Sequence, residues 1–184
     1  CKERTDAGLS RFGESLIDEM NRVGMMVDCS HMGFATSMDV MAMSTAPVVF
    51  SHSNALAMND HPRNIRDEQI DACAATGGMM GVNGVGIFLG NNDCSPANRL
   101  RHIDYIADRV GPQHVGLASD YLYHREVTSP TLWNPPHRGD VPWPEINYSE
   151  PESVPELTEM LLTRGYSDND VKGILGDNWL RVVS

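Results

Sequence analysis

Apolar positions along the chain alternate between helical stripes and short uninterrupted runs. From Leu9 onward an apolar residue recurs every three or four positions as far as Val23, which is the spacing of one helix face. Gly24 is placed to end that helix. The run 25–27 shows no polar alternation, as expected of a strand that is covered on both faces. The start of the chain therefore predicts one helix followed by one strand.

The same helix and strand pattern then recurs. Helices are predicted at about 35–44, 68–75 and 96–110, and strands at 48–50, 79–82 and 114–118. The third of these helices opens with Ser95 as N-cap and Pro96 at its first position. Regular alternation of this kind predicts parallel strands joined by helical crossovers. Four strands cannot close an eight-stranded barrel, so the α/β fold is either a small open sheet or half of a (β/α)8 barrel.

The pattern breaks between residues 121 and 153, which hold six of the 11 prolines and two of the three tryptophans. A segment of this length without regular structure is typical of a functional lid or a disordered insertion. Two more helices are predicted beyond it, one from Pro155 to Gly165 and one that opens at Ser167 with a capping-box spacing. We expect residues 1–184 to form a single domain with a proline-rich loop inserted at 121–153.

Composition and charge narrow the classes of function. The 184 residues include 14 basic and 25 acidic side chains, giving a formal net charge of -11, and no basic cluster stands out. Nucleic-acid binding is therefore not expected, because phosphate recognition needs concentrated Lys and Arg. No apolar run approaches the ~18 residues that cross a bilayer. The 4 cysteines have no paired spacing and are interpreted as isolated thiols.

Polar residues with metal-binding chemistry follow the predicted strands. His31 comes after the first strand, His52 after the second and Asp120 after the fourth. Parallel α/β folds gather such residues at the carboxyl edge of the sheet. Two imidazoles and a carboxylate are ligands typical of zinc or another transition metal. From spacing alone, a structural role with each His hydrogen-bonded at its strand end is the alternative.

Two further positions carry candidate chemistry. Arg63 lies in the loop after the second strand, where its guanidinium can either bind a substrate carboxylate through two hydrogen bonds or form a structural ion pair. His102 and Asp104 have the spacing of many metal-binding pairs, but they fall in the middle of a predicted helix. Residues two apart on a helix do not face one another, so we interpret this pair as part of a solvent-exposed face.

The segments around the candidate residues have a specific arrangement. MMVDCSH at 25–31 is followed by APVVFSHSN at 46–54 and by HPRN at 61–64. This arrangement resembles the membrane (renal-type) dipeptidase family of the amidohydrolase superfamily. The likeness extends through 81–83 and 114–120 to the C-terminal region. It implies that the chain is the C-terminal half of a (β/α)8 metallo-dipeptidase barrel.

The resemblance also implies a reaction and a set of roles. It implies zinc-dependent hydrolysis of dipeptides, including those with a C-terminal D-residue, by a metal-bound hydroxide at a binuclear Zn2+ site. By position, His31 and His52 match two ligands of one zinc ion. Arg63 matches the residue that binds the dipeptide carboxylate, and Asp120 matches a catalytic carboxylate that contacts the substrate and moves a proton. The other ligands that the family implies, including a bridging glutamate, belong to the first half of the barrel and have no counterpart here.

The half-barrel interpretation leads to expectations about the partners, the source and the location of the protein. Because it leaves two sheet edges open, we expect it to form a homo-oligomer, to pair with a complementary N-terminal half-barrel or to aggregate. Leu122 stands where many family members have a second acid, and this loop resembles a bacterial branch. No signal-peptide pattern is visible, and we expect a cytoplasmic rather than a periplasmic location. Two alternatives stay open: another amidohydrolase-type reaction, such as deamination or lactam opening, and a non-catalytic half-barrel binding module.

Overall fold

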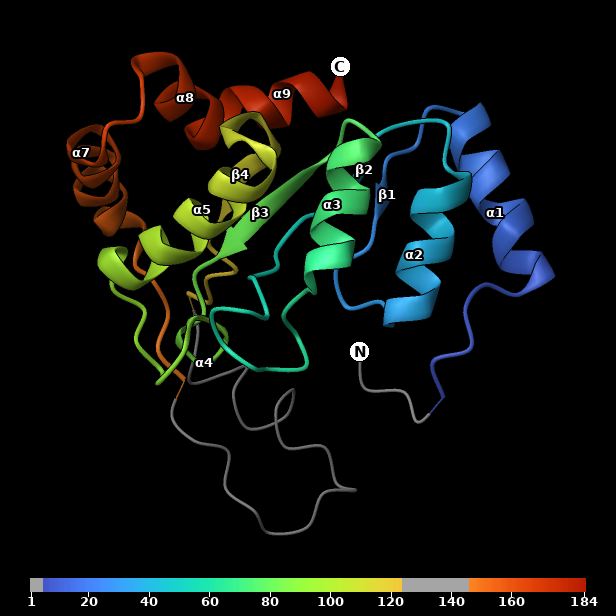
Figure 1. Cartoon of the computed structure of the whole chain (residues 1–184), viewed down its shortest axis with the longest axis horizontal. Coiled ribbons are helices and arrows are strands. Elements are labelled where there is room, and N and C mark those ends of the chain that lie inside the picture. The colour runs from blue at the N-terminus through green and yellow to red at the C-terminus, as the bar shows by residue number, and fades with distance from the viewer. Residues whose placement is uncertain (1–4, 124–145) are drawn as a thin grey trace, which may run out of the picture.

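The computed structural model describes residues 5–123 and 146–184, and its core is one parallel sheet (Figure 1). Its strands follow one another in sequence order, β1-β2-β3-β4. They are β1 (Val27–Asp28), β2 (Val48–Phe50), β3 (Met79–Asn83) and β4 (Val115–Ala118). Sequential parallel strands with helical crossovers are the repeating unit of the (β/α)8 barrel. The prediction of four parallel strands in the topology of a half-barrel is confirmed.

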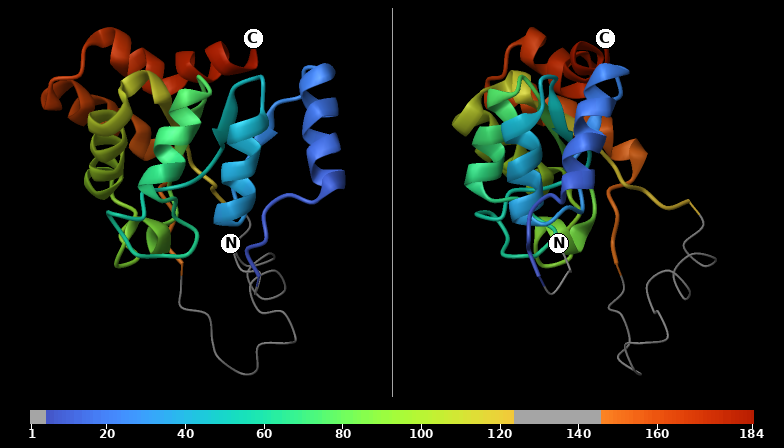
Figure 2. Two further views of the ribbon diagram at one scale, coloured as in Figure 1. Left: turned by 45° about the vertical axis from the view of Figure 1, so that its right-hand side comes forward. Right: turned by 90° about the vertical axis from the view of Figure 1, so that its right-hand side faces the viewer.

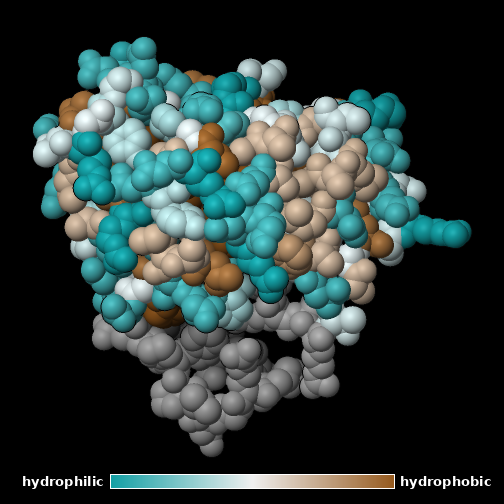
Figure 3. Space-filling view, in the orientation of Figure 1, coloured by the Kyte–Doolittle hydropathy of each residue, from teal (hydrophilic) through white to brown (hydrophobic). Residues whose placement is uncertain are grey.

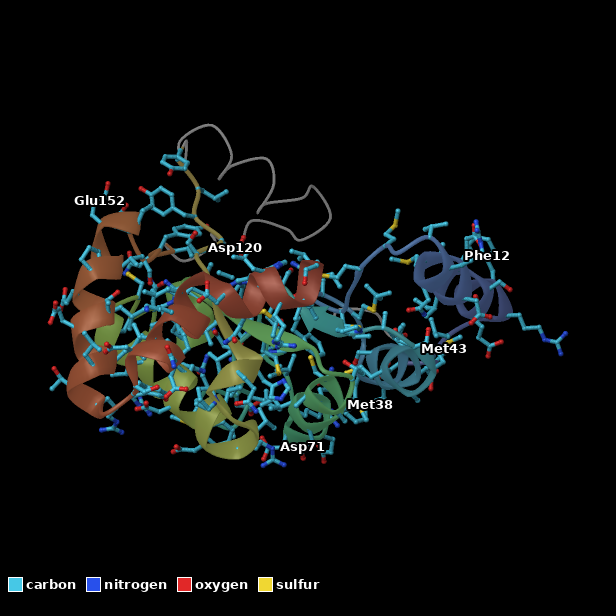
Figure 4. The ribbon with its side chains drawn as sticks, turned by 90° about the horizontal axis from the view of Figure 1, so that it is seen from above. Phe12, Met38, Met43, Asp71, Asp120 and Glu152 are labelled. Atoms are coloured by element: carbon cyan, nitrogen blue, oxygen red, sulfur yellow. The ribbon has the colours of Figure 1, made fainter. Side chains whose placement is uncertain are left out.

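Helices connect the strands and cover one face of the sheet. Figure 4, which views the molecule from above, shows the helices between β1 and β4 on the same side of the strands and the first helix beyond β1. They are α1 (Arg11–Arg22), α2 (Phe34–Met43), α3 (Asp67–Ala75), the single turn α4 (Gly86–Leu89) and α5 (Pro96–Val110). The core forms where their inner faces meet the sheet, and Val40, Ile70 and Ile103 are fully buried there. On this face α3 packs against β2 and β3, and α5 packs against β3 and β4.

The C-terminal helices close the amino end of the sheet. At that end lie the π-helical turn Gly173–Asp177 and α9 (Asn178–Val183), as Figure 2 shows, whereas α7 (Val154–Arg164) packs against α5 and leads into α8 (Asp168–Lys172). The side chains of Asn178 and Arg181 donate to backbone carbonyls just before β3 and β4, among them Pro112 at 2.9 Å and Gly77 at 2.7 Å. The opposite, carboxyl edge is left to the loops that carry the candidate residues.

The starts of these helices agree with the sequence patterns. Ser95 accepts a hydrogen bond from the backbone of Asn98, and Pro96 occupies the first turn of α5. Ser167 and Asp170 form the predicted capping box of α8. Each arrangement satisfies backbone N–H groups that a helix start leaves without intrahelical partners.

Glycine permits a close approach of β2 and β3 at the carboxyl edge. A Cβ on Gly81 would lie 2.2 Å from the backbone oxygen of Ser51, which is too close for any side chain. Just beyond, the N–H of Ser53 donates to the carbonyl of Gly81 at 2.9 Å. The start of the loop that carries His52 is thereby held against β3.

Two local predictions from the sequence were wrong. The first strand is Val27–Asp28 rather than 25–27, and Met25 is 57% exposed. The reason is that β1 forms the edge of this sheet, so only Val27 is covered. His102 is not on a solvent-exposed face but is 1% exposed on the inner side of α5. Its burial is tolerated because Nδ1 accepts from the N–H of Ala55 and Nε2 lies 3.0 Å from the carbonyl of Leu89.

The proline-rich loop predicted at 121–153 falls largely outside the described residues. At its described ends, Tyr148 forms an antiparallel bridge with Val85, and Pro151–Ser153 form a 3-10 turn. Cys29 and Cys73 are free thiols, as predicted, and Cys1 lies outside the described residues. In the described part of the chain, every helix is too short or too polar to cross a bilayer.

Candidate functional site

The carboxyl ends of β1 and β2 bring two imidazole rings together. Nε2 of His31 lies 2.8 Å from Nε2 of His52. The ring centroids are 4.9 Å apart and the ring planes are inclined by 56°. His31 has a φ of 68°, in the left-handed region that residues other than glycine rarely adopt. Backbone strain of this kind is most often found where function requires a fixed side-chain position.

A polar network behind the rings fixes His52. Ser51 Oγ lies 2.7 Å from Nδ1 of His52 and 2.5 Å from Oδ2 of Asp28. The other carboxylate oxygen of Asp28 accepts the N–H groups of Ser30 and Ser51, at 2.9 and 3.0 Å. Burial raises the pKa of Asp28, but the hydrogen bonds from Ser51 and Ser30 outweigh it and lower the pKa overall. Asp28 is therefore held as a carboxylate between the two turns.

The charges around His31 favour its neutral form. Its pKa is lowered, first by burial and then by the positive charges of Arg63 and His52. The carboxylates of Asp120 and Asp28 act in the opposite direction without reversing the shift. Metal ions bind neutral imidazole, so this environment extends the metal-binding form of His31 to lower pH.

Arg63 lies directly beside His52. Its Nη2 donates to the backbone carbonyl of His52 at 3.1 Å, and its guanidinium lies 5.4 Å from the ring centroid of Phe88. The residue is 6% exposed. Burial lowers its pKa, while Asp120 and Asp28 act to raise it. Since an arginine stays protonated at physiological pH, a fixed positive charge lies next to the pair of histidines.

Asp120, which is labelled in Figure 4, lies just beyond the carboxyl end of β4. It too has a left-handed backbone, with a φ of 50°. Its Oδ2 accepts a hydrogen bond from Nδ2 of Asn83 at 2.9 Å. Asn83 is itself held at the end of β3, because its N–H donates to Oδ1 of the buried Asn54 at 2.9 Å. The orientation of the Asp120 carboxylate is thus set by the neighbouring strand.

The structure brings the predicted residues together to different degrees. His31 and His52 converge, and Arg63 is hydrogen-bonded to the backbone of His52. Asp120 is hydrogen-bonded to Asn83, and its charge acts on both Arg63 and His31. Sequence reasoning had assigned no role to three residues that orient this set, namely Asp28, Ser51 and Asn83. The available signal was their position at strand ends, next to the candidate ligands.

The pair of histidines fits part of a zinc site. Zinc binds imidazole nitrogen at about 2.0–2.1 Å in a tetrahedral arrangement, which places two ligand nitrogens roughly 3.3 Å apart. The 2.8 Å separation of Nε2 in His31 and His52 is about half an ångström shorter than that spacing. Within residues 5–123 and 146–184, no cluster of three or more His, Cys, Asp or Glu is placed to hold a metal. Among the described residues, the candidate metal ligands are thus the two imidazoles of His31 and His52.

A cavity of about 390 Å³ lies beside these residues. Its lining includes His31 and Arg63, together with Phe34, Asp60 and Arg66. The volume falls within the range of small-ligand sites, and the lining offers both charged groups and apolar surface. The carboxyl edge thus combines two potential metal ligands, a fixed cation, a carboxylate and space for a small polar molecule.

Two convergent imidazoles at the carboxyl edge of a parallel half-barrel are typical of (β/α)8 proteins that bind metal at the strand ends. A family model then gives the particular family. The model of the membrane dipeptidases, peptidase family M19, matches residues 1–129. The chain belongs to the membrane dipeptidase family.

Curated relatives extend this likeness over almost the whole chain. It is 35% identical to dipeptidase verJ of Clonostachys rogersoniana, over 96% of this chain and 41% of that protein. It is 34% identical to dipeptidase aclJ of Aspergillus oryzae, over 99% of this chain and 40% of that protein. The chain therefore spans about two fifths of the length of these relatives.

Solved structures agree in fold. An amidohydrolase from Pseudomonas aeruginosa superimposes with a TM-score of 0.87 at 33% identity, over 100% of this chain and 58% of that one. A metallo peptidase from Rhodobacter sphaeroides, liganded with a phosphinate mimic of the dipeptide L-Ala-D-Ala, has a TM-score of 0.75 at 27% identity. That match covers 96% of this chain and 46% of the other. In both, this chain corresponds to roughly half of a longer protein.

Proposed function

We propose that the protein containing this chain is a zinc-dependent dipeptidase, and that the chain supplies part of both its metal site and its substrate site. The observation that carries the proposal is the 2.8 Å approach of the two Nε2 atoms of His31 and His52. Membership of the membrane dipeptidase family and relatives named as dipeptidases support the substrate class. The mimic of L-Ala-D-Ala bound by the Rhodobacter sphaeroides peptidase supports dipeptides with a C-terminal D-residue.

The proposed roles follow from the chemistry of each side chain. His31 and His52 hold a zinc ion through Nε2. When bound, zinc would polarise the scissile carbonyl and make a nearby water more acidic. Arg63 binds the carboxylate of the dipeptide, because its guanidinium matches a carboxylate through two hydrogen bonds. Asp120, oriented by Asn83, accepts the proton of the attacking water and passes it to the leaving amine.

We further propose that the remaining metal ligands come from a complementary N-terminal half-barrel. Two imidazoles are fewer than the three or four protein ligands of a typical zinc site. Ligands in barrel enzymes come from the ends of several different strands, and this chain contributes only part of a barrel. Among the described residues, β1 and β4 each have one neighbouring strand, so further strands can pair with their open edges.

Metal removal and restoration tests the proposed function. The full-length protein is dialysed against a chelator, titrated with Zn2+ and assayed for hydrolysis of L-Ala-D-Ala, with zinc content measured in parallel. We expect hydrolysis to disappear with the metal and to return with it. His31→Ala and His52→Ala should lose zinc, whereas His114→Gln, at the amino end of β4, should retain it. Hydrolysis that persists in metal-free protein would contradict the proposal.

A further inference from the structure

The hydrogen bonds around Asp28 determine where the hydroxyl proton of Ser51 lies. Oδ1 of Asp28 accepts two backbone N–H groups, and Oδ2 lies 2.5 Å from Ser51 Oγ. A carboxylate is an acceptor only, so the single hydroxyl proton of Ser51 is donated to Asp28. The other hydroxyl nearby, Ser30 Oγ, is 3.4 Å from Ser51 Oγ and is the weaker acceptor at that distance.

The position of that proton fixes the tautomer of His52. Ser51 Oγ lies 2.7 Å from Nδ1 of His52, so one proton must lie between the two atoms. Since Ser51 donates its own proton to Asp28, the proton in this contact belongs to Nδ1. A neutral imidazole carries one N–H, which leaves Nε2 of His52 with its lone pair. This is the same Nε2 that faces His31.

We propose that Asp28 and Ser51 form a positioning device that locks His52 in the Nδ1–H tautomer, with Nε2 ready to bind a metal ion before the ion arrives. The proposal rests on the proposed function, since it gives the metal site a supporting relay within the same chain. Ser30 completes the device from the backbone side, because its Oγ accepts the N–H of His52 at 3.0 Å. Ring and main chain of His52 are thereby both tied to the end of β1.

Without these hydrogen bonds, His52 should bind zinc more weakly. A histidine free in water favours the opposite tautomer, with its proton on Nε2, and that form must lose or move the proton before it can bind zinc. Partners that orient a metal-binding imidazole typically contribute a factor of about 10–100 in metal affinity. Removal of the Ser51 hydroxyl should therefore weaken zinc binding to that extent while leaving both imidazoles in place.

The experiment reads the tautomer directly. The full-length, metal-free protein is labelled with 15N-histidine, and the His52 ring is observed by two-bond 1H–15N correlation spectra at neutral pH. Zinc affinity is measured separately by competition with a chromogenic chelator. We expect wild-type His52 to carry its proton on Nδ1. Ser51→Ala should lose this preference and bind zinc about 10–100-fold more weakly, and Ser51→Thr, which retains a hydroxyl, should restore both.

Ser44 provides the control, because its hydroxyl donates to the carbonyl of Ala46 at 2.8 Å just before β2, at the other end of that strand from His52. Ser44→Ala should leave the tautomer and the zinc affinity unchanged. A wild-type His52 with its proton on Nε2, or a folded Ser51→Ala variant with unaltered tautomer and affinity, would overturn the inference. If Ser51→Ala does not fold, the wild-type spectrum decides alone. Neither readout requires dipeptide turnover, so a locked His52 in a protein inactive on dipeptides supports this inference and contradicts the proposed function.

Discussion

At the scale of single residues, the candidate site lies where the backbone leaves its ordinary conformations. His31 and Asp120 have φ values of 68° and 50° and lie within three residues of the ends of β1 and β4. A left-handed conformation in such residues costs about 1–3 kcal/mol and persists only when the surroundings hold it. Packing and hydrogen bonds at the strand ends supply that restraint, as the bond from Asn83 to Asp120 shows.

Arg63 gives the most specific prediction about the substrate. In the full-length protein, Arg63→Ala should raise KM for dipeptides roughly 10- to 100-fold, which corresponds to the ~1.5–3 kcal/mol of a hydrogen bond to a charged group. The effect should be absent for substrates whose C-terminal carboxylate is replaced by an amide. Steady-state kinetics on matched acid and amide substrates measures it.

Arg109→Ala serves as its control, because Arg109 pairs with Asp71 on the outer surface, away from the strand ends. This variant should show unchanged kinetics. If Arg63→Ala also leaves KM unchanged, the arginine does not bind the substrate carboxylate. Another amidohydrolase-type reaction, such as deamination or lactam opening, would then be favoured over dipeptide hydrolysis.

Single residues also show what the sequence could predict of the site. His31, His52 and Asp120 could be found because each follows a strand with a clear apolar pattern. The roles of Asp28 and Ser51 could not, since they depend on a contact between two turns 23 positions apart in the chain. Aligned strand ends bring such turns together, and no local pattern specifies the side-chain hydrogen bonds between them.

At the scale of the elements, α5 stabilises the carboxyl ends of β3 and β4 through hydrogen bonds. Arg99 on this helix is 2% exposed and donates to the carbonyls of Val82 and Ala118, at 2.8 and 2.9 Å. Burial lowers its pKa to about 10, which leaves it charged at neutral pH. The helix thereby joins β3 to β4 just before Asn83 and Asp120, so the packing of α5 bears directly on the geometry of the site.

Arg99→Met should destabilise the fold through these carbonyls. The thioether fills part of the space but donates no hydrogen bond, and a buried acceptor left without a partner costs about 1–3 kcal/mol. Urea unfolding of the variant and the wild type measures the difference in free energy. Arg109→Ala, which breaks the surface ion pairs of Arg109 on the same helix with Asp67 and Asp71, should cost under about 1 kcal/mol. Equal effects of the two substitutions would contradict this role for Arg99.

His102 on α5 gives the fold a pH dependence. Its pKa is lowered, mainly by burial and further by Arg101, against the opposing hydrogen bond to Leu89. The unfolded chain therefore takes up a proton near pH 6.5 while the folded chain resists it. The free energy of unfolding should fall as pH drops below that value, and the fall should level off below the folded pKa.

Urea unfolding at pH 7.5 and at pH 5.5 checks this prediction, with His102→Gln as the comparison. Glutamine cannot titrate, so the variant should lose part of the difference between the two pH values. An identical pH dependence in wild type and variant would show that other groups control it.

Helix α5 also shows why the burial of polar residues could not be predicted from the sequence. Its apolar stripe correctly predicted the helix, but polar residues such as Arg99 and His102 are expected at the surface by default. In the interior, Arg99 donates to backbone carbonyls of β3 and β4, and His102 contacts the carbonyl of Leu89 in α4 and the N–H of Ala55. Those partners come from segments distant in sequence, and for this reason a local pattern could not reveal them.

At the scale of the whole molecule, the alternation of helices and strands was enough to predict the parallel sheet, because crossover rules leave few other topologies. On the face seen in Figure 3, the right-hand part over α2 shows more apolar surface than the left-hand part. At the β1 end, Phe12 is 77% exposed and Met25 57%. Apolar surface next to a strand with one neighbour favours association.

The chain of residues 1–184, produced alone, should therefore self-associate. Light scattering at increasing concentration should give a mass above the 20.3 kDa of one chain. Addition of a complementary N-terminal half-barrel should reduce that self-association, since it would cover the same edges. A monodisperse monomer of the isolated chain that also hydrolyses dipeptides would contradict both the proposed pairing and the need for further ligands.

The most direct test of the central claim is the position of zinc in the full-length protein. Crystals grown with Zn2+ are measured above and below the zinc absorption edge, so that an anomalous difference map locates the ion. We predict a peak about 2.0–2.1 Å from Nε2 of both His31 and His52. A zinc ion bound elsewhere, with these two nitrogens still in contact with each other, would contradict the account.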